Sequence, residues 1–362
     1  MRLASLLLLN FALLCAALLT ACGSKPQPAT SSQPKPGPQT TAVSLPPPGA
    51  DPVPPTSATN ARVTQIYMHN VMLNENAGLK LRVRWLRGKM LPSNPGVVPS
   101  FDQPSSFMLD IEAGVVGISF DDLNHALNSG MLKGSPLENV TVSPVGRQQI
   151  KMTGTLHKAF PLPIEMTSDL AAAPDGRILM HVRKMRVLKL PIKGLLDALH
   201  ITAGDLVDPK GAAGVEVSRD DIYFDPEQIL PPPRKRGKLT DVHIGKLGDI
   251  VEVYGQARPE VQQVRQWRNF IELQGGSLEF GKLTMQHVDL VMIDVSDDDW
   301  FKFDLPHYQE QLVYGYTRMT PQAGLRIFMP DVDRIPRNQD NRNIGLQWMR
   351  NRNLPPPPGL LH

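Results

Sequence analysis

The residues of this chain that come closest to a catalytic or binding motif form a glycine-rich segment in its second half. Gly276, Gly281 and Lys282 have the spacing of a loop that binds phosphate through backbone N–H groups and a lysine. The next residue is Leu283, so the hydroxyl that would bind Mg²⁺ is missing, and the apolar residues between the glycines alternate as in a strand. We therefore expect a β-strand here and no nucleotide site.

A group of aspartates is the second candidate, because hard cations such as Ca²⁺ bind several oxygen ligands. Their spacing does not match the calcium loop of an EF-hand, and Trp300, Phe301 and Phe303 lie among them. A solvated turn is the favoured interpretation, and a cation site is the alternative. The aspartates concerned are Asp294, Asp297, Asp298, Asp299 and Asp304.

Other catalytic arrangements have little support in the sequence. No two of the 9 histidines lie four residues apart with a glutamate between them, as in zinc hydrolases. The Gly-x-Ser-x-Gly motif of a nucleophilic serine does not occur. The adjacent acids at positions 121–122 and 220–221 sit at a helix cap or point to opposite faces, so they are poor acid/base pairs. We expect no catalytic residue, no metal and no cofactor, and hence a protein that is not an enzyme.

Two further features suggest contact with lipid. Arg234, Lys235 and Arg236 form a basic run in a proline-rich loop, where each charge would contribute about 1 kcal/mol beside anionic headgroups. An ordinary solvated loop is the simpler interpretation of that run. The chain also has 15 methionines, whose flexible thioethers suit an adaptable apolar surface, although ordinary core packing explains them too. Those at inward strand positions are Met152, Met166, Met180, Met185, Met285 and Met292.

The segment from Arg177 to Val207 is expected to organise the fold that positions these residues. Apolar residues alternate from Ile178 to Val182, and the adjacent charges Arg183 and Lys184 then shift the phase, as a β-bulge would. After Pro191 the period becomes helical. The apolar face of this predicted helix consists of Ile192, Leu195, Leu196 and Leu199.

A second helix is predicted to begin at Ser119. The serine can cap the helix, and the acids that follow it lie where the helix dipole favours negative charge. Phe120, Leu123 and Leu127 share its apolar face. A curved strand next to two amphipathic helices requires a sheet against which both helices can pack.

The amino terminus is typical of a targeting segment. An apolar run from Leu3 to Ala21 precedes Cys22, and Leu19-Thr20-Ala21-Cys22 resembles the lipobox of bacterial lipoproteins. In those proteins the signal is cut before the cysteine and the thiol is acylated, so the resemblance implies export and a lipid anchor at Cys22. An ordinary secretory signal or an uncleaved membrane anchor are the alternatives. The other cysteine, Cys15, lies within the signal, so no disulfide can form within the mature chain.

The predicted organisation follows from composition. Residues 1–21 form the signal, residues 22–57 a proline-rich disordered linker, residues 58–336 a β-rich domain with a boundary near residue 210 as an option, and residues 337–362 a loose tail. The 38 basic and 35 acidic residues are too balanced to indicate a nucleic-acid partner.

Two stretches resemble a known family. GISFDDLNHALNSG at 117–130 and PDGRILMHVRKMRVLKLPIKGLLDALHI at 174–201 are similar to the LmeA-like (DUF2993) exported phospholipid-binding proteins of the TULIP superfamily. The resemblance covers residues 117–207 and implies a long antiparallel sheet rolled around a helix, with an apolar groove. The chain departs from that family in its long linker and in the residues after Val207.

We therefore expect an α+β fold with a long curved antiparallel sheet rolled around one or two amphipathic helices. The predicted function is an exported, membrane-anchored protein of the bacterial cell envelope, facing the periplasm, at the outer membrane rather than the inner, that binds or shuttles the acyl chains of phospholipid or another lipid. The alternative is a non-enzymatic envelope scaffold that binds protein partners. The predicted groove residues are Phe120, Leu123, Leu127, Met180, Val182, Met185, Val187, Leu195, Leu196 and Leu199, with Arg234, Lys235 and Arg236 as headgroup contacts.

Overall fold

The structure is a computed structural model that describes residues 63–75, 79–132, 135–157, 160–188, 214–230, 232–256 and 267–335. Several predictions made from the sequence lie outside these residues. They are the signal segment, the anchor at Cys22, the proline-rich linker, the helix from Ile192 to Leu199 and the tail from residue 337.

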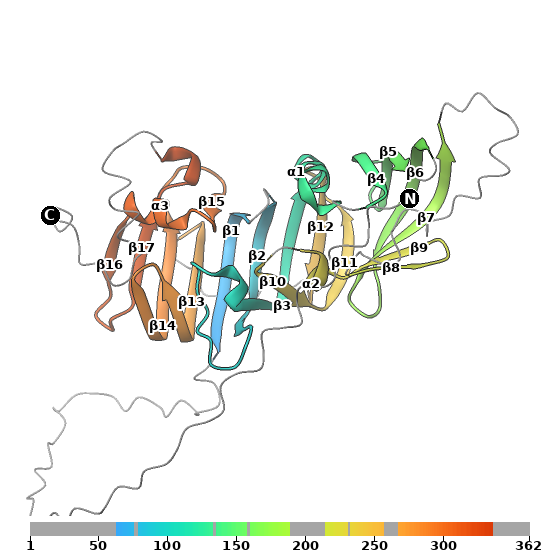
Figure 1. Ribbon diagram of the computed structural model, residues 1–362. Helices are drawn as coiled ribbons and strands as arrows, with labels where there is room; N and C mark the ends of the chain where they lie inside the picture. The colour runs from blue at the N-terminus through green and yellow to red at the C-terminus, as the bar shows by residue number, and fades with distance from the viewer. Residues whose placement is uncertain are drawn as a thin grey trace, which may run out of the picture. The chain divides into compact units, whose positions relative to one another are not determined.

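The larger of two sheets has 11 strands (Figure 1). Nine of them follow the order β11-β12-β3-β2-β1-β13-β14-β17-β16, while β10 pairs parallel with β3 and β15 pairs parallel with β1. The alternation of apolar and charged residues explains why this part of the chain forms strand β2, in which Leu81 and Val83 are buried and Lys80 and Arg84 are exposed. The strands are β1 (Thr64–Asn74), β2 (Lys80–Pro92), β3 (Phe107–Ser119), β10 (Arg234–Gly237), β11 (Leu239–Ile244), β12 (Asp249–Tyr254), β13 (Phe270–Phe280), β14 (Leu283–Asp294), β15 (Phe301–Asp304), β16 (Tyr316–Met319) and β17 (Leu325–Met329).

The smaller sheet has 6 strands in the order β4-β5-β6-β7-β9-β8. Its strands are β4 (Leu137–Pro144), β5 (Gln149–His157), β6 (Pro161–Ala172), β7 (Ile178–Val187), β8 (Val215–Ser218) and β9 (Asp221–Phe224). The predicted bulge in β7 is confirmed, because Val182 pairs with Ser168 and Lys184 with the adjacent Thr167, which leaves Arg183 as the extra residue. Met185 and Val187 then continue the pairing beyond the bulge.

Helices are few in the described residues. They are α1 (Phe120–Ala126), α2 (Pro226–Ile229) and α3 (Tyr308–Val313), with a π turn at Leu127–Met131 and 3₁₀ turns at Pro104–Ser106 and Val332–Arg334. The predicted cap of α1 is confirmed, because the Ser119 hydroxyl accepts a hydrogen bond from the Asp122 backbone N–H at 3.1 Å.

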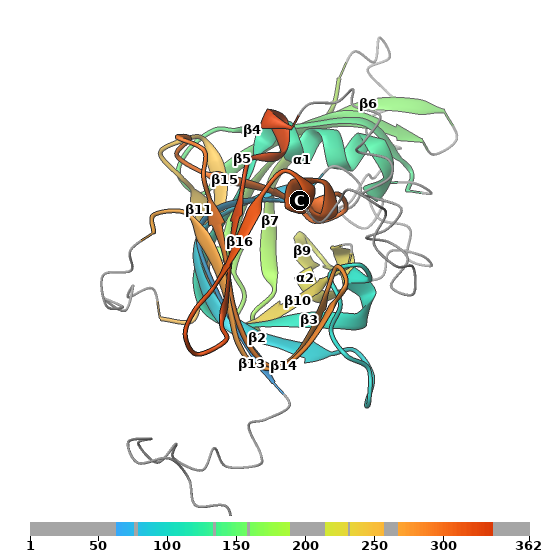
Figure 2. The same cartoon turned by 90° about the vertical axis from the view of Figure 1, so that its left-hand side faces the viewer.

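Side chains from both sheets form one continuous apolar core. It includes Leu81 and Val116 from the larger sheet and Met152 and Met180 from the smaller one. The sheets also meet through a backbone hydrogen bond of 2.6 Å, which the N–H of Ile244 donates to the carbonyl of Arg147. Both sheets are twisted and curved (Figure 2).

The α+β class is therefore correct in its coarse form, with curved sheets and few helices. The prediction of a single antiparallel sheet differs from the structure, which has two sheets and three parallel pairings, β1 with β15, β3 with β10 and β14 with β17. In each of these pairs the two strands are far apart in the sequence, so the chain can return to the same end of the sheet before they pair, as parallel pairing requires.

The helix α1 lies beside β4, the edge strand of the smaller sheet (Figure 1). Asn124 of α1 and Asn128 of the π turn that follows it join this segment to β4. The Asn124 amide accepts from the Val142 N–H at 2.7 Å and donates to the Val142 carbonyl at 3.0 Å. Asn128 makes the same pair of bonds with Val140, at 2.9 and 2.7 Å. These side chains take the place of a further strand at Val140 and Val142, whose backbone groups are thereby satisfied, and they hold α1 against β4.

This arrangement predicts that Asn124→Ala will lower the free energy of unfolding by about 1 to 3 kcal/mol, because both backbone groups of the buried Val142 lose their partner. Urea denaturation would measure the change. The matched control is Asn94→Ala at an exposed loop position, expected to fall within about 0.5 kcal/mol of the wild type. Equal effects of the two substitutions would contradict the proposed role of Asn124.

Candidate functional site

The described residues line a partly open apolar cavity of about 630 Å³. Its wall comes from both sheets and from α1, because alternation along each strand turns every second side chain toward the shared interior. The volume lies within the range of about 300 to 1,000 Å³ that is usual for ligand pockets. Representative lining residues are Leu81 of β2, Val116 of β3, Leu123 of α1, Val142 of β4, Met180 of β7 and Ile222 of β9.

The structure brings together part of the predicted groove. Leu123, Leu127 and Met180 line the cavity. Phe120 and Val182 are buried in the core around it. Met185 and Val187 are half-buried at the margin of that core, and Leu195, Leu196 and Leu199 lie outside the described residues.

Sequence reasoning missed the half of the cavity that the larger sheet supplies. Leu79, Leu81 and Val83 alternate clearly with polar residues, so their burial was readable from the sequence. These three residues face the same space as Met180 because of the way the two sheets pack against each other. A local sequence pattern does not predict that packing.

The ionisable residues of the cavity wall form one group. Lys235, Glu252 and Tyr254 line the cavity, and Glu75 lies behind Lys235. We call these four residues the Lys235 cluster. The Lys235 ammonium donates to Glu75 Oε2 at 2.7 Å and to the Pro233 carbonyl at 3.2 Å, and the Tyr254 hydroxyl donates to Glu252 Oε2 at 2.7 Å.

The strand pairing explains how the cluster assembles. Both β10 and β12 lie along the same edge of β3, with Lys235 opposite Leu109 and Tyr254 opposite Gly114. The chain bends closely between them at Gly237, where a β-carbon would lie 2.8 Å from the Tyr254 ring. Glu75 lies just after the end of β1 and is 160 residues from Lys235 in the sequence.

Burial dominates the electrostatics of this cluster. It raises the pKa of Glu75 and of Glu252, and the nearby Lys235 ammonium opposes both shifts. Burial and the neighbouring Glu252 carboxyl also raise the pKa of Tyr254 well above its ordinary value, so that its hydroxyl remains a hydrogen-bond donor. The Lys235 ammonium therefore pairs directly with Glu75 and acts on Glu252 through its charge.

In the structure, the three side chains of the basic run at residues 234–236 do not all point to the same side. It forms strand β10, so the expectation of a loop was wrong. Arg234 and Arg236 point outward, the latter paired with Asp110 at 3.1 Å, whereas Lys235 is buried and faces the cavity. The three residues therefore do not present one surface, as strand alternation would have shown had the run been assigned to a strand.

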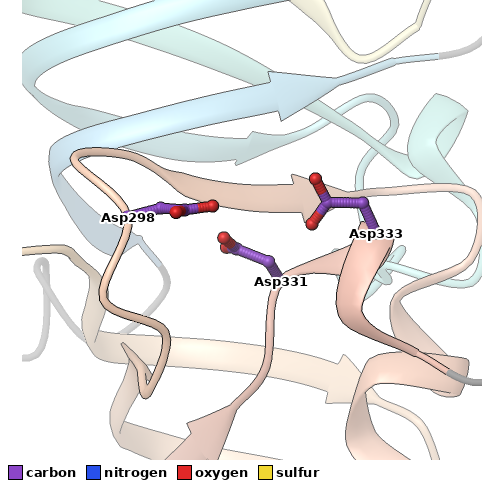
Figure 3. A group of neighbouring side chains, drawn as sticks. All are labelled: Asp298, Asp331 and Asp333. Atoms are coloured by element: carbon purple, nitrogen blue, oxygen red, sulfur yellow. The ribbon is translucent and has the colours of Figure 1, made fainter.

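The acidic stretch contributes to a different group (Figure 3). Asp298 points toward Asp331 and Asp333, which follow β17, and the ligand oxygens of the three lie within 4.8 Å of one another. The Lys302 ammonium lies 2.6 Å from Asp298, 2.7 Å from Asp333 and 3.9 Å from Asp331. Because cations of the protein itself already pair with these carboxylates, Lys302 at the centre and Arg334 at 3.3 Å from Asp298, we interpret the group as an ion-pair network.

The glycine-rich segment is a strand, as expected. Gly276 and Phe280 belong to β13, and Gly281 begins the tight turn to β14. Its backbone N–H donates to the hydroxyl of Tyr308 at 2.8 Å, which joins the turn to an aromatic cluster of Phe101, Phe280 and Phe303.

Comparison with protein-family models, with curated proteins and with solved structures found no match for this chain. The resemblance of residues 117–207 to LmeA-like proteins therefore stays a prediction. Within the described residues, none of the helices has the length and apolar character needed to cross a bilayer. Fold and site together define a β-rich protein with an internal apolar cavity and one charged patch on its wall.

The ion-pair network predicts a pH dependence. Burial and the nearby Asp294 and Asp298 raise the pKa of Asp331 to about 7, above its value of about 3.9 in an unfolded chain. The folded state therefore binds this proton more tightly, so its contribution to stability is complete below about pH 4 and is lost as the pH rises through about 7.

We expect the free energy of unfolding of the wild type to fall more between pH 5 and 8 than that of Asp331→Asn, whose amide does not titrate. Urea denaturation at both pH values would measure the difference. Asp333→Asn is the control, because this exposed carboxylate pairs with the same lysine but is not buried. Identical pH slopes for the wild type and Asp331→Asn would show that Asp331 does not titrate in this range.

Proposed function

We propose that this chain is a membrane-anchored protein of the bacterial cell envelope that binds the acyl chain of a lipid in its internal cavity. The observation that carries the proposal is the cavity of about 630 Å³, lined largely by leucine, isoleucine, valine and methionine. Acyl chains suit such a wall, because each buried CH₂ group contributes about 0.8 kcal/mol to binding.

The character of the wall supports an apolar occupant. Most of the wall is apolar and offers water within the cavity no hydrogen-bond partner. An acyl chain that takes the place of this water removes apolar surface from contact with water, which favours binding.

The kind of side chain in the wall also supports a flexible ligand. Met68, Met152 and Met180 line the cavity from three strands. Unbranched thioethers adapt to ligands of different shape, which fits a site that accepts lipid chains of different length. The resemblance of residues 117–207 to a family of phospholipid-binding proteins points to the same class of ligand.

A pair of substitutions tests whether the cavity binds a ligand. Val116→Phe adds bulk to a side chain that lines the cavity, and Val71→Phe adds the same bulk to a core residue that does not. The chain would be produced from residue 22 onwards with Cys22→Ser, so that no detergent is needed. The probe is N-phenyl-1-naphthylamine, an uncharged dye whose fluorescence rises in apolar sites.

We expect Val116→Phe to weaken dye binding by about tenfold or more while changing the free energy of unfolding by less than about 1 kcal/mol. Val71→Phe should destabilise the fold by about 1 to 3 kcal/mol, because no space is left for the ring. If the wild type does not bind the dye and both substitutions are equally destabilising, the core is solid and the scaffold hypothesis is the better one.

The membrane anchor is a separate part of the proposal and rests on the sequence at Cys22. An acylated cysteine would hold the chain on a membrane, since two or more acyl chains together give stable attachment. We expect the chain expressed in a bacterium to enter the detergent phase of a Triton X-114 extract, and Cys22→Ser to move it to the aqueous phase. Partitioning that does not change with Cys22→Ser would exclude acylation at this residue.

A further inference from the structure

The Lys235 cluster is unusual because it places charges inside an otherwise apolar cavity. Side chains of Lys235 and Glu75 are 6% and 0% exposed and lie 2.7 Å apart. Oε1 of Glu75 is buried and has no hydrogen-bond partner. A buried ion pair of this kind is seldom more stable than apolar residues of the same volume, so stability alone does not account for the cluster.

The lysine retains one unused donor. An ammonium group has three hydrogens, and those of Lys235 are donated to Glu75 and to the Pro233 carbonyl, which uses two. Because Lys235 lines the cavity, a ligand oxygen that enters this part of it can accept the third.

Charge balance limits which ligand oxygen that can be. Among the described residues that line the cavity, Lys235 is the one with a positive charge, and it already neutralises Glu75. Glu252 lines the same part of the wall and holds the Tyr254 hydroxyl. An anionic head would bring a further negative charge beside these carboxyl groups, and like charges placed together in an interface repel one another and weaken binding.

From this arrangement we propose that the cavity takes acyl lipids with an uncharged, oxygen-bearing head, such as a monoacylglycerol, in preference to fatty acids or anionic phospholipids. Lys235 donates to an ester or hydroxyl oxygen of the head, and Glu252 disfavours a carboxylate or phosphate in the same place. The assignment rests on the proposed function, because it names the class of lipid that the same cavity binds.

Displacement of N-phenyl-1-naphthylamine tests the proposal with two lipids that share one acyl chain. The probes are 1-oleoylglycerol and oleate, each added below the concentration at which it aggregates, at pH 8. We expect the wild-type chain to bind 1-oleoylglycerol about tenfold or more tightly than oleate. Glu252→Gln keeps the size of the side chain and removes the carboxyl group that can ionise, so it should tighten oleate binding by about tenfold and change 1-oleoylglycerol binding by less than about threefold.

Glu216→Gln is the matched control, because Glu216 also lies on a strand but its side chain is 63% exposed and pairs with Arg177. It should change neither affinity. Oleate binding as tight as that of 1-oleoylglycerol in the wild type would overturn the inference while leaving lipid binding intact. Because this comparison uses the wild type alone, it tests the inference even if Glu252→Gln does not fold. If neither lipid displaces the dye, the proposed function itself fails.

Discussion

The constraint on which this structure depends is that two curved sheets share one apolar core without filling it. Each sheet must bury one face, and strand alternation provides the apolar side chains to do so. Side chains from both sheets, such as Leu81, Val116 and Met180, end in a common space. A protein with such a space must either be stable while the space is unoccupied or bind a ligand in the space.

The helix and the edge strand show how this space is held open. Asn124 and Asn128 bind both backbone groups of two residues in β4, so α1 takes the place of a neighbouring strand and its apolar face is fixed toward the cavity. Leu123 and Leu127 are thereby placed in the wall. Neither asparagine lines the cavity, so this segment of the chain keeps its polar contacts with β4 outside the cavity and presents its leucines to it.

Much of the local structure was predictable from the sequence, because periodicity and capping are local. The bulge at Arg183, the cap at Ser119 and the inward positions of Met152 and Met180 all follow from residue types and spacing. The site depends on pairings between distant segments. Glu75 and Lys235 meet only because β1 and β10 belong to one sheet, and Asp298 meets Asp331 and Asp333 only through the return of β17, so no short motif could have shown either group.

The central claim is that the cavity holds lipid, and native mass spectrometry of the chain from residue 22 onwards, with Cys22→Ser and purified without detergent, tests it most directly. The account predicts a species heavier than the bare polypeptide by the mass of one acyl lipid, which is lost after extraction with organic solvent and restored by incubation with lipid. A single species at the mass of the polypeptide, unchanged after incubation with acyl lipids, would contradict it.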